Sequence, residues 1–535
     1  MPGQGRAGSG DRPPEDLSLP PLGAEERRTL GYASAIGSEF GFGLLVAAMA
    51  VDEETLAERL EGLVRRGILL ERAGGGQFAF TEERVRADIY RSLTESHRRV
   101  LHRKIAEVME RLRPDPSPEV LSELGRHYFL GKVHPKSYDL NRRAAEIARA
   151  AGEPDVAIHN LERAAVELEA LPGDRRAERA EVAEALGDLY YSKSNFRAAG
   201  RHYNEALERV DREQPRVRAR LLLARAEIAR ESLDLEAAIE GASQALHLFE
   251  GVEDWIGVAQ AHRVLGRVAF LQGRYRDALD QNMQALGGLP ASAGPDVKGR
   301  LSLDIGNAFS MLGGDVATEA REWLERAVEQ LRRGHDTVEL SRALHNLGVT
   351  AGETHPQEGL EYLQQAREIA DRTHDTRRLG RVLLSGIEMR LALGQVQEAR
   401  RDNEQAAKIV EGLADGFWME QAVLNRGMIA EKTGQWDDAG TAYERAVEMS
   451  RAAHLAVEES EAQFFLARLR FKTRDFVRAR EALRRATDLR VAELVPRLAP
   501  LYEQLRRNLE DQAPDAGPPP TSDPSPPAPE RGGSA

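Results

Sequence analysis

The sequence predicts an all-α fold: a superhelical α-solenoid of about nine helical hairpins that follows a small N-terminal domain. Three observations support this prediction. A pattern of small residues recurs nine times along the 535 residues, at intervals of 39 to 42 residues. Apolar residues within each interval follow the spacing of amphipathic helices. Proline gathers at the two ends, with five in residues 1–22 and eight in residues 511–535. A fixed period of this length is typical of stacked helical hairpins.

Each copy of the repeat combines a small anchor residue with two later alanines. In one copy Gly187 is followed by Ala199 after twelve residues, and then by Tyr203 and Ala206. Small residues allow two helices to cross closely, so we expect the alanine twelve residues on to be the partner of the anchor. The nine anchors are Ala145, Gly187, Ala226, Gly266, Gly306, Gly348, Ile387, Gly427 and Ala467.

The residues of this pattern resemble the tetratricopeptide repeat, which has Leu-Gly, a Tyr-like position, Ala, an aromatic residue and then Ala. The resemblance covers about residues 138–490 and implies a right-handed superhelix whose concave face binds proteins or peptides. The period is near forty, where the usual unit of the family has thirty-four residues, and the first-helix Trp is missing. The repeats are therefore most similar to the longer-helix variety of bacterial and archaeal sensor and regulator proteins.

The residues before the repeats follow a different pattern. Helical spacing predicts helices over Glu25–Ile36, Phe42–Met49 and Glu53–Arg66, the last with Asp52 as its N-cap. Two short apolar runs, Ile68–Leu70 and Gln77–Phe80, flank three consecutive glycines and predict a β-hairpin. Three helices followed by a hairpin are the order of a winged-helix domain.

Residues 27–71 and 78–112 also resemble the winged-helix segment that follows the nucleotide-binding core in STAND-type signalling ATPases, such as activators of the maltose-regulon type. Thr81-Glu82-Glu83 stands where that family usually has a His-Asp pair. The motif G-x-x-x-x-G-K-[ST] occurs nowhere in the chain, so ATP hydrolysis cannot be carried over. The resemblance implies a sensor half without its motor, which works with a separate signalling ATPase or alone as an adaptor.

These patterns divide the chain into six parts. We expect a disordered N-terminal tail, a winged-helix-like domain, a junction helix, the repeat array, a capping helix and a disordered Pro-rich tail with a PxxP sequence at Pro524–Pro527. Their predicted ranges are 1–24, 25–113, 114–137, 138–492, 493–510 and 511–535.

Charge and composition exclude several classes of function. The chain has 74 basic and 87 acidic side chains, a formal net charge of −13, which disfavours nucleic acid as a general partner. The longest apolar stretch, Phe40–Val51, is too short to span a bilayer, and the first twenty residues lack a signal-peptide core. We therefore expect a cytoplasmic protein without membrane contact.

Catalytic and metal-binding motifs are missing from the sequence. Without cysteine, thiolate chemistry and disulfides are excluded. His97 and His102 lie five residues apart on what we expect to be a solvated basic helix, which is the wrong spacing for one metal-binding face. We expect a protein that is not an enzyme and needs no cofactor.

The concave face of the repeats is the remaining candidate site. In the resembled family, inward-facing residues lie six and three positions before the anchor and one, four and five after it. Arginines there would donate to carboxylates of an acidic peptide segment, and asparagines would pair with its backbone. The alternative is that the arginines form ion pairs along and between helices, since 66 of the 74 basic residues are arginine. The candidate groove residues are Arg263, Arg300, Asn307, Arg342, His345, Asn346 and Arg381.

The function predicted from the sequence is a scaffold or sensor in signalling or regulation that binds a protein or peptide partner. Three alternatives stay open: a transcriptional regulator that uses the winged helix on DNA, a detached sensor subunit of a STAND-type ATPase, and a sensor of a small ligand. The sequence does not predict the oligomeric state.

Overall fold

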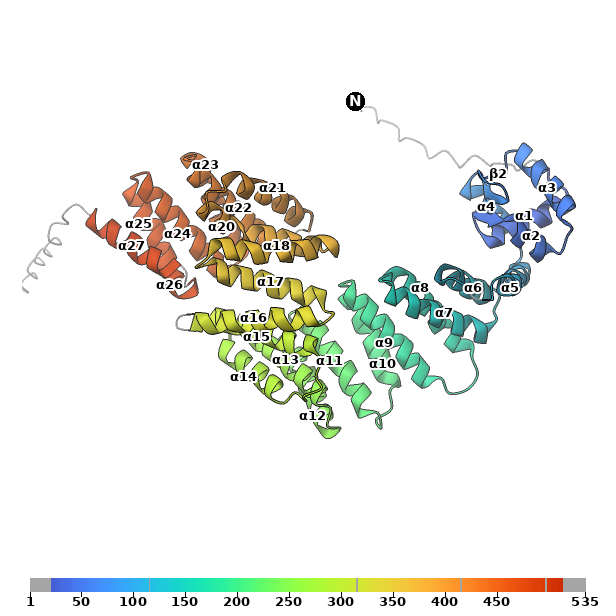
Figure 1. Cartoon of the computed structure of the whole chain (residues 1–535), viewed down its shortest axis with the longest axis horizontal. Helices are drawn as coiled ribbons and strands as arrows, with labels where there is room; N and C mark the ends of the chain where they lie inside the picture. The colour runs from blue at the N-terminus through green and yellow to red at the C-terminus, as the bar shows by residue number, and fades with distance from the viewer. Residues whose placement is uncertain (1–20, 115, 314–315, 414–415, 496–497, 513–535) are drawn as a thin grey trace, which may run out of the picture. The chain divides into compact units, whose positions relative to one another are not determined.

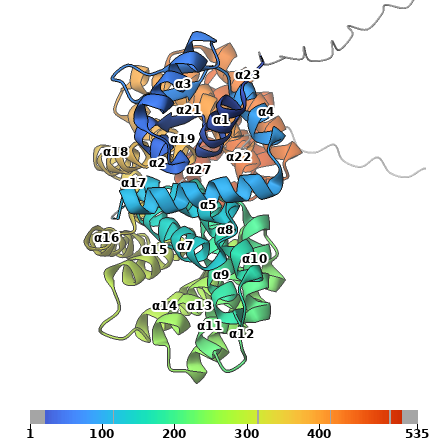
Figure 2. The ribbon, with the colours of Figure 1, turned by 90° about the vertical axis from the view of Figure 1, so that its right-hand side faces the viewer.

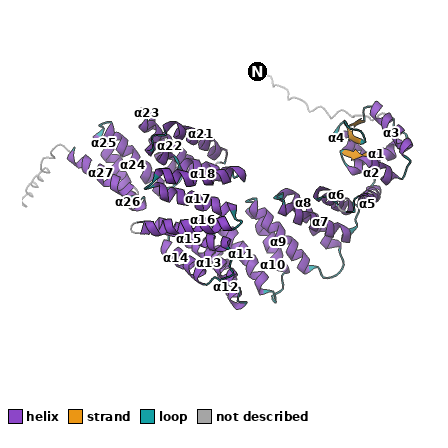
Figure 3. Ribbon diagram, viewed as in Figure 1, coloured by secondary structure: helices purple, strands orange, loops and turns teal. Residues whose placement is uncertain are grey.

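The computed structural model describes residues 21–114, 116–313, 316–413, 416–495 and 498–512. The expected N-terminal tail, apart from its last four residues, lies outside the described residues, as do the Pro-rich tail from residue 513 onward and its PxxP sequence. The chain forms two compact units, Met1–Gly241 and Ala242–Ala535. Both are made of helices, and the strands lie only near the N-terminal end of the described part (Figures 1 and 3).

The first unit begins with a small module that contains helices and a three-stranded antiparallel sheet. The strand order is β1-β3-β2, with Phe40 opposite Phe78 and Leu70 opposite Ala79. The predicted helices and hairpin are present, but β1 was not predicted, because its three residues are too few to show a pattern and pair only with the distant β3. The elements are α1 (Ala24–Ile36), β1 (Glu39–Gly41), α2 (Phe42–Met49), α3 (Glu53–Arg65), β2 (Leu69–Glu71), β3 (Gln77–Phe80), α4 (Glu83–Ser92) and α5 (Glu95–Leu112).

Helix α3 shows why this module folds as its sequence predicts. The Asp52 carboxylate accepts a hydrogen bond from the Thr55 backbone N–H at 2.8 Å and caps the helix. Leu56, Leu60 and Leu63, spaced at helical intervals, are fully buried. Helix α5 contacts α1 and α2 and lies along the module (Figure 2). A single apolar core therefore joins the module to α5.

The expectation that the helix of His97 and His102 is solvated was wrong for part of α5. His102 is 1% exposed. Its Nε2 lies 2.8 Å from the Tyr90 hydroxyl, and its Nδ1 lies 2.9 Å from Nδ1 of His127 on the next helix. Burial and the neighbouring His127 lower the pKa of His102 to about 3. The burial of His102 could not be predicted from the polar sequence of α5, because its partners Tyr90 and His127 lie on other helices.

The repeats follow as helical hairpins. All nine predicted hairpins are present, and each anchor lies in the first helix of its hairpin. In the Ile387 copy, the first helix has a one-residue interruption at Gly386. Helix α6 (Pro118–Leu130) precedes the first hairpin. The helices of the nine hairpins are α7 (His134–Ala150), α8 (Pro154–Ala170), α9 (Arg176–Ser192), α10 (Phe196–Arg209), α11 (Pro215–Glu231), α12 (Leu235–Gly251), α13 (Trp255–Leu271), α14 (Tyr275–Gly287), α15 (Pro295–Leu312), α16 (Ala317–Arg333), α17 (Thr337–Gly352), α18 (Pro356–Arg372), α19 (Thr376–Ser385), α20 (Ile387–Ala392), α21 (Val396–Gly412), α22 (Gly416–Lys432), α23 (Trp436–Ala452), α24 (Ala456–Lys472) and α25 (Phe476–Asp488).

The anchors are small for a slightly different reason from the predicted one. A Cβ at Gly187 would lie 2.6 Å from the Tyr203 ring, and a Cβ at Gly427 would lie 2.5 Å from the Tyr443 ring. At Gly187, Gly266 and Gly427 the nearest side chain is therefore that of the larger residue sixteen positions on, and not that of the alanine twelve positions on. At Gly306 and Gly348, where the turns differ in length, it is that of Leu324 and Leu363. Any larger anchor would push the second helix away, so the tyrosine and the glycine form one packing unit.

The end of the array is closed by two short helices, α26 (Val491–Leu494) and α27 (Ala499–Asp511). Tyr502, Leu505 and Leu509 of α27 are buried in the apolar core of the last repeats. The Tyr502 hydroxyl lies 2.7 Å from the Thr487 hydroxyl of α25. An amphipathic helix at the predicted position thus covers the last repeat, as open-ended arrays require.

The helices of the described residues are not suited to crossing a membrane. None of them is both long and apolar enough to do so.

Candidate functional site

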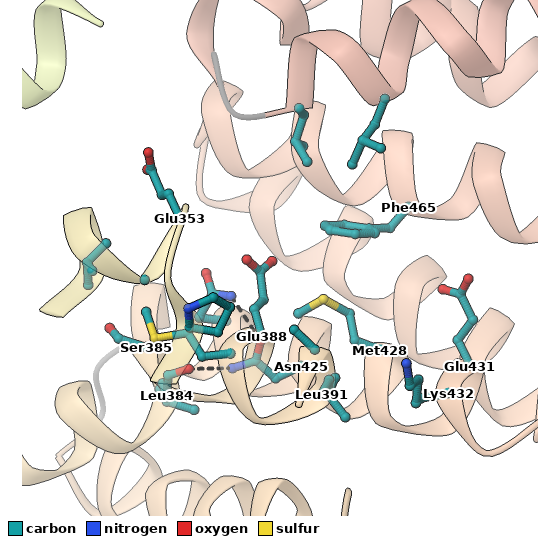
Figure 4. A pocket seen from close by; sticks show the side chains of 18 of the residues that line it. Glu353, Leu384, Ser385, Glu388, Leu391, Asn425, Met428, Glu431, Lys432 and Phe465 are labelled. Atoms are coloured by element: carbon teal, nitrogen blue, oxygen red, sulfur yellow. Dashed lines mark hydrogen bonds between the residues drawn. The ribbon is translucent and has the colours of Figure 1, made fainter. Parts of the chain in front are cut away.

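The second unit contains a cavity of about 900 Å³ on the first helices of four successive hairpins and on the final helix. Helices α17, α20, α22 and α24 supply most of the lining, and Leu498 and Leu501 close one end. Figure 4 shows side chains from these helices facing a common space. The other lining residues are Val349, Gly352, Glu353, Pro356, Leu384, Ser385, Glu388, Met389, Leu391, Ala392, Phe417, Trp418, Gln421, Asn425, Met428, Glu431, Lys432, Phe465, Arg468 and Lys472.

The lining follows the repeat in a regular way. Positions one, four and five after each anchor contribute Met428, Glu431 and Lys432 from α22, and their equivalents from the neighbouring repeats. The position two before the anchor contributes Asn425 and its equivalents Ser385 and Phe465. Positions one, four and five after the anchor, which the sequence pattern expects to face inward, thus contribute to the cavity, but none of the seven candidate groove residues is among its lining residues.

The floor of the cavity is a chain of polar contacts. Nδ2 of Asn425 donates to the backbone oxygen of Leu384 at 3.2 Å, which ties α22 to α19 (Figure 4). Nε2 of Gln421 donates to Oδ1 of Asn425 at 3.3 Å. The Ser385 hydroxyl lies 2.9 Å from Nε2 of His345. Amide and hydroxyl groups are thus held in fixed positions beneath the opening.

Aromatic side chains make up one wall. Phe417 and Trp418 meet edge to face, with ring centroids 5.2 Å apart, and Phe417 is 40% exposed. Phe465 stacks on Tyr443 at 5.8 Å, and the Arg468 guanidinium lies 4.6 Å from the Phe465 ring centroid. An apolar surface open to solvent beside fixed polar groups is the usual composition of a ligand or peptide site.

A buried carboxylate organises the far end of the cavity. Glu431 accepts hydrogen bonds from the Tyr443 hydroxyl at 2.7 Å, from Arg468 at 2.8 Å and from Lys472 at 2.7 Å. Burial alone would raise the pKa of Glu431, but Arg468 and Lys472 outweigh it and hold the pKa below its usual value. The same contacts raise the pKa of Arg468. This end therefore stays charged at neutral pH.

Three of the predicted groove arginines lie in internal ion pairs. Nε of Arg263 and Nη2 of Arg342 each lie 2.7 Å from the carboxylate of Asp304. Glu339 pairs with the same two arginines at 3.1 and 3.0 Å. The Arg300 Nε donates to Asp336 at 2.7 Å. These contacts agree with the alternative reading, in which the arginines stabilise neighbouring helices.

The other predicted residues divide into two groups. Asn346 donates to Asn307 at 2.6 Å, which joins α17, the first helix of the cavity, to α15. Nε2 of His345 lies 2.9 Å from the cavity residue Ser385, and Arg381 lies 5.4 Å over the ring centroid of the cavity residue Trp418. His345 and Arg381 thus lie behind the lining. Arg342 and Asn346 lie on α17 outside the lining, and Arg263, Arg300 and Asn307 lie on earlier repeats.

Little in the sequence indicates that the lining residues Phe417, Trp418, Met428, Lys432 and Arg468 belong to a site. Phe417 and Trp418 lie at the start of their helix, outside the positions taken as inward-facing. Met428, Lys432 and Arg468 do occupy such positions, but they are not part of a run of the same residue type through three consecutive repeats, as Arg300, Arg342 and Arg381 are. Among the described residues, no group of three His, Asp or Glu side chains could hold a metal ion.

Comparisons with known proteins agree with the repeat. A tetratricopeptide repeat model matches residues 120–212, 217–291 and 418–490. No curated protein matches the chain.

Several solved structures share the arrangement of hairpins at low identity. A signal transduction ATPase with numerous domains from Pyrococcus horikoshii, which has a tetratricopeptide repeat sensor, is 14% identical; the match covers 91% of this chain and 66% of that protein, with a TM-score of 0.46. Aspartyl phosphate phosphatase F from Bacillus subtilis is 13% identical over 70% of this chain and 93% of its own, with a TM-score of 0.43. A Rap protein in complex with the competence and sporulation factor is 13% identical; the match covers 77% of this chain and 96% of that protein, with a TM-score of 0.33. The match to the repeat model and the order of the helices identify a TPR-like solenoid fold, which is typical of protein-interaction modules.

Proposed function

We propose that this chain is a non-enzymatic scaffold or sensor of the cytoplasm, and that it binds a peptide segment of a protein partner in the cavity of its second unit. The observation that carries the proposal is the lining: the exposed ring of Phe417 and the partly buried ring of Trp418 stand beside fixed amide and hydroxyl groups. Aromatic anchors supply contact area, and polar groups fix the orientation of what binds.

The polar floor suits an extended peptide. Asn425 is 1% exposed, and its amide donates to Leu384 and accepts from Gln421, so it fixes the position of Gln421. Gln421 is half-buried, and its second amide hydrogen and its carbonyl oxygen can pair with a ligand. A peptide backbone offers alternating donors and acceptors that such amides can match. The position two before the anchor recurs on successive first helices, so a partner that crosses them meets one residue of this position in each repeat.

The predicted groove residues enter this proposal in a supporting role. His345 and Arg381 would act through Ser385 and Trp418, which they hold from behind. A partner segment longer than the cavity would continue over the repeats that carry Arg263, Arg300, Asn307, Arg342 and Asn346. An acidic partner would have to compete there with Asp304, Asp336 and Glu339.

A signalling role together with a separate ATPase is a second candidate. It rests on the N-terminal module, whose order of helices and hairpin suits a winged helix that joins a motor to a sensor. Arg126 of α6 donates to the backbone oxygen of Ile36 at 3.0 Å, and His127 of α6 meets His102 of α5. These contacts couple the module to the helix that precedes the repeats. DNA binding is less favoured, because α3 carries four glutamates against three arginines at Arg59, Arg65 and Arg66.

The experiment that tests the proposal compares two double variants as bait in the native cell. Phe417→Ala with Lys432→Ala removes an aromatic ring and a cation from the cavity. Trp436→Ala with Lys408→Ala removes the same kinds of side chain from exposed positions outside it. We expect a partner captured by the wild type to be lost with the first pair and kept with the second. Equal capture by both variants would contradict a partner site in the cavity.

A further inference from the structure

The charges that line the cavity are not mixed evenly. Among the described lining residues, α17 and α20 contribute two carboxylates, Glu353 and Glu388, and no cation. Helices α22 and α24 contribute three cations, Lys432, Arg468 and Lys472, and the single carboxylate Glu431. Figure 4 shows Glu353 and Lys432 on opposite sides of the space, with Asn425 and Met428 between them.

The positive end has an excess of cations that its own acid cannot neutralise. Glu431 is buried, with a side chain 4% exposed, and it already binds both Arg468 and Lys472. Lys432 is exposed, and the described residues give its ammonium no ion-pair partner. Two positive charges are therefore in excess at this end, and one of them faces solvent at the cavity.

Between the sides of Glu353 and Lys432, the cavity has the carboxylate of Glu388 and otherwise uncharged groups (Figure 4). Met428, Phe465 and Trp418 give it apolar and aromatic surface, and Gln421 and Asn425 give it amides. An apolar wall between two charged ends lowers the local dielectric constant. The electrostatic interaction between the charges of a ligand and these side chains is therefore stronger than in open water.

We infer that the segment bound here is bipolar: a cationic side chain at one end, an aromatic or large apolar residue in the centre and a carboxylate at the other end. This inference rests on the proposed function and names the chemistry of its partner. The cation faces Glu353 and Glu388, and the carboxylate faces Lys432. A segment with two like charges places one of them against an end of its own sign, which costs binding.

The test uses peptides whose own termini are blocked by acetylation and amidation, so that only side chains carry charge. Four pools share an aromatic or leucine centre flanked by Ala, Gly or Ser and carry a neutral fluorophore. Their outer positions are Lys with Glu, Lys with Lys, Glu with Glu, or Ser with Ser. Because a peptide can lie in either direction, the mixed pool contains both orders. Fluorescence anisotropy with the full chain gives the affinity for each pool.

We expect the mixed pool to bind about tenfold more tightly than either like-charged pool, the size of effect expected for one pair changed from attraction to repulsion near a protein surface. Lys432→Glu shifts the preference about tenfold toward the Lys/Lys pool, and Glu353→Lys shifts it toward the Glu/Glu pool. The matched controls Lys408→Glu and Glu404→Lys, both exposed on α21 and outside the cavity, leave the order of the pools unchanged.

Two results would overturn the inference, and they differ from failure of the proposed function. One is equal binding of mixed and like-charged pools, with loss of all binding in Phe417→Ala; the cavity then binds peptides without reading charge. The other is a preference that Lys432→Glu and Glu353→Lys leave unchanged while both variants keep the wild-type melting temperature. If no peptide pool binds the wild type, and Phe417→Ala leaves the capture of the native partner unchanged, both the inference and the peptide-binding function fail.

Discussion

Two neighbouring parts of the second unit treat buried charge in opposite ways. In the repeats anchored at Gly266, Gly306 and Gly348, Asp304 lies between Arg263 and Arg342 and all three side chains are satisfied. In the repeats from Ile387 onward, Glu420 is 1% exposed and has the carboxylates Glu461 and Glu458 as neighbours, so that it stays protonated. The first part is an arginine-rich face that is already paired. The second part has the cavity, where the exposed Lys432 has no ion-pair partner among the described residues. A cation without a counter-charge beside a hollow surface therefore indicates a binding site better than the number of arginines does.

The largest effect we expect comes from breaking the paired face. Asp304→Asn leaves Arg263 and Arg342 close together without their shared counter-charge. Removing one partner of a buried ion pair costs about 3–5 kcal/mol, so we expect the free energy of unfolding to fall by about that amount. Urea denaturation followed by circular dichroism measures it. Asp437→Asn, at an exposed position on α23, serves as control and changes the stability little. A loss as small as that of the control would show that Glu339 alone can balance the two arginines.

The buried carboxyl of Glu420 makes the stability of the second part depend on pH. Burial, with Glu461 and Glu458 nearby, raises the pKa of Glu420 to about 8, and its Oε1 has no hydrogen-bond partner. The unfolded chain ionises this carboxyl near its ordinary pKa, while the folded chain keeps it protonated. Folding therefore takes up a proton, and stability falls as the pH rises from about 5 toward 8. At about 1.4 kcal/mol per pH unit, the loss between pH 5 and pH 7 is about 3 kcal/mol.

The variant Glu420→Gln keeps the shape of the protonated side chain and removes its titration. We expect the difference in stability between variant and wild type to grow with pH over this range, as measured by urea denaturation at several pH values. Glu404→Gln, at an exposed position, gives a constant difference. A flat difference for Glu420→Gln as well would mean that Glu420 is ionised in the folded chain.

A smaller effect distinguishes binding from stability. Phe417→Ala removes an exposed ring from the cavity wall, so we expect the affinity for the mixed peptide pool to fall about tenfold, or about 1.4 kcal/mol, with little change in melting temperature. Trp436→Ala, which removes a ring of similar exposure outside the cavity, leaves the affinity unchanged. If both substitutions weaken binding equally, the peptides bind over a diffuse aromatic surface.

The smallest effect tests the predicted arginine groove. Arg300 and Asp336 form a partly exposed ion pair, so Arg300→Ala costs at most about 1 kcal/mol of stability. We expect peptide affinity to stay the same, because Arg300 is not among the cavity residues. Anisotropy with the Glu/Glu pool checks this most sensitively. Weaker binding of that pool alone would restore Arg300 to the partner site.

The fold was largely predictable, because the same pattern of residues recurs in nine copies. In most copies a small anchor and a larger residue about sixteen positions on predict a close helix crossing, and a single copy that departs from the pattern does not change the prediction. The cavity was harder to predict, because its shape depends on how neighbouring hairpins stack and on where α27 begins. The ion pairs of Arg263 with Asp304 and Glu339 join residues 41 and 76 positions apart, so the separation alone does not reveal them. The short strand β1 and the buried His102 escaped for the same reason, since both depend on distant partners.

The most direct test of a partner site in the cavity exploits the absence of cysteine. Phe417→Cys and Trp436→Cys each create a single thiol in an otherwise cysteine-free chain, which a benzophenone maleimide can label at one known position. Irradiation with the native partner or the mixed peptide pool then reports contact at that position by mass spectrometry. Cross-links from position 417 and none from position 436 are the predicted result. Equal cross-linking from both positions, or cross-linking from 436 alone, would contradict the site.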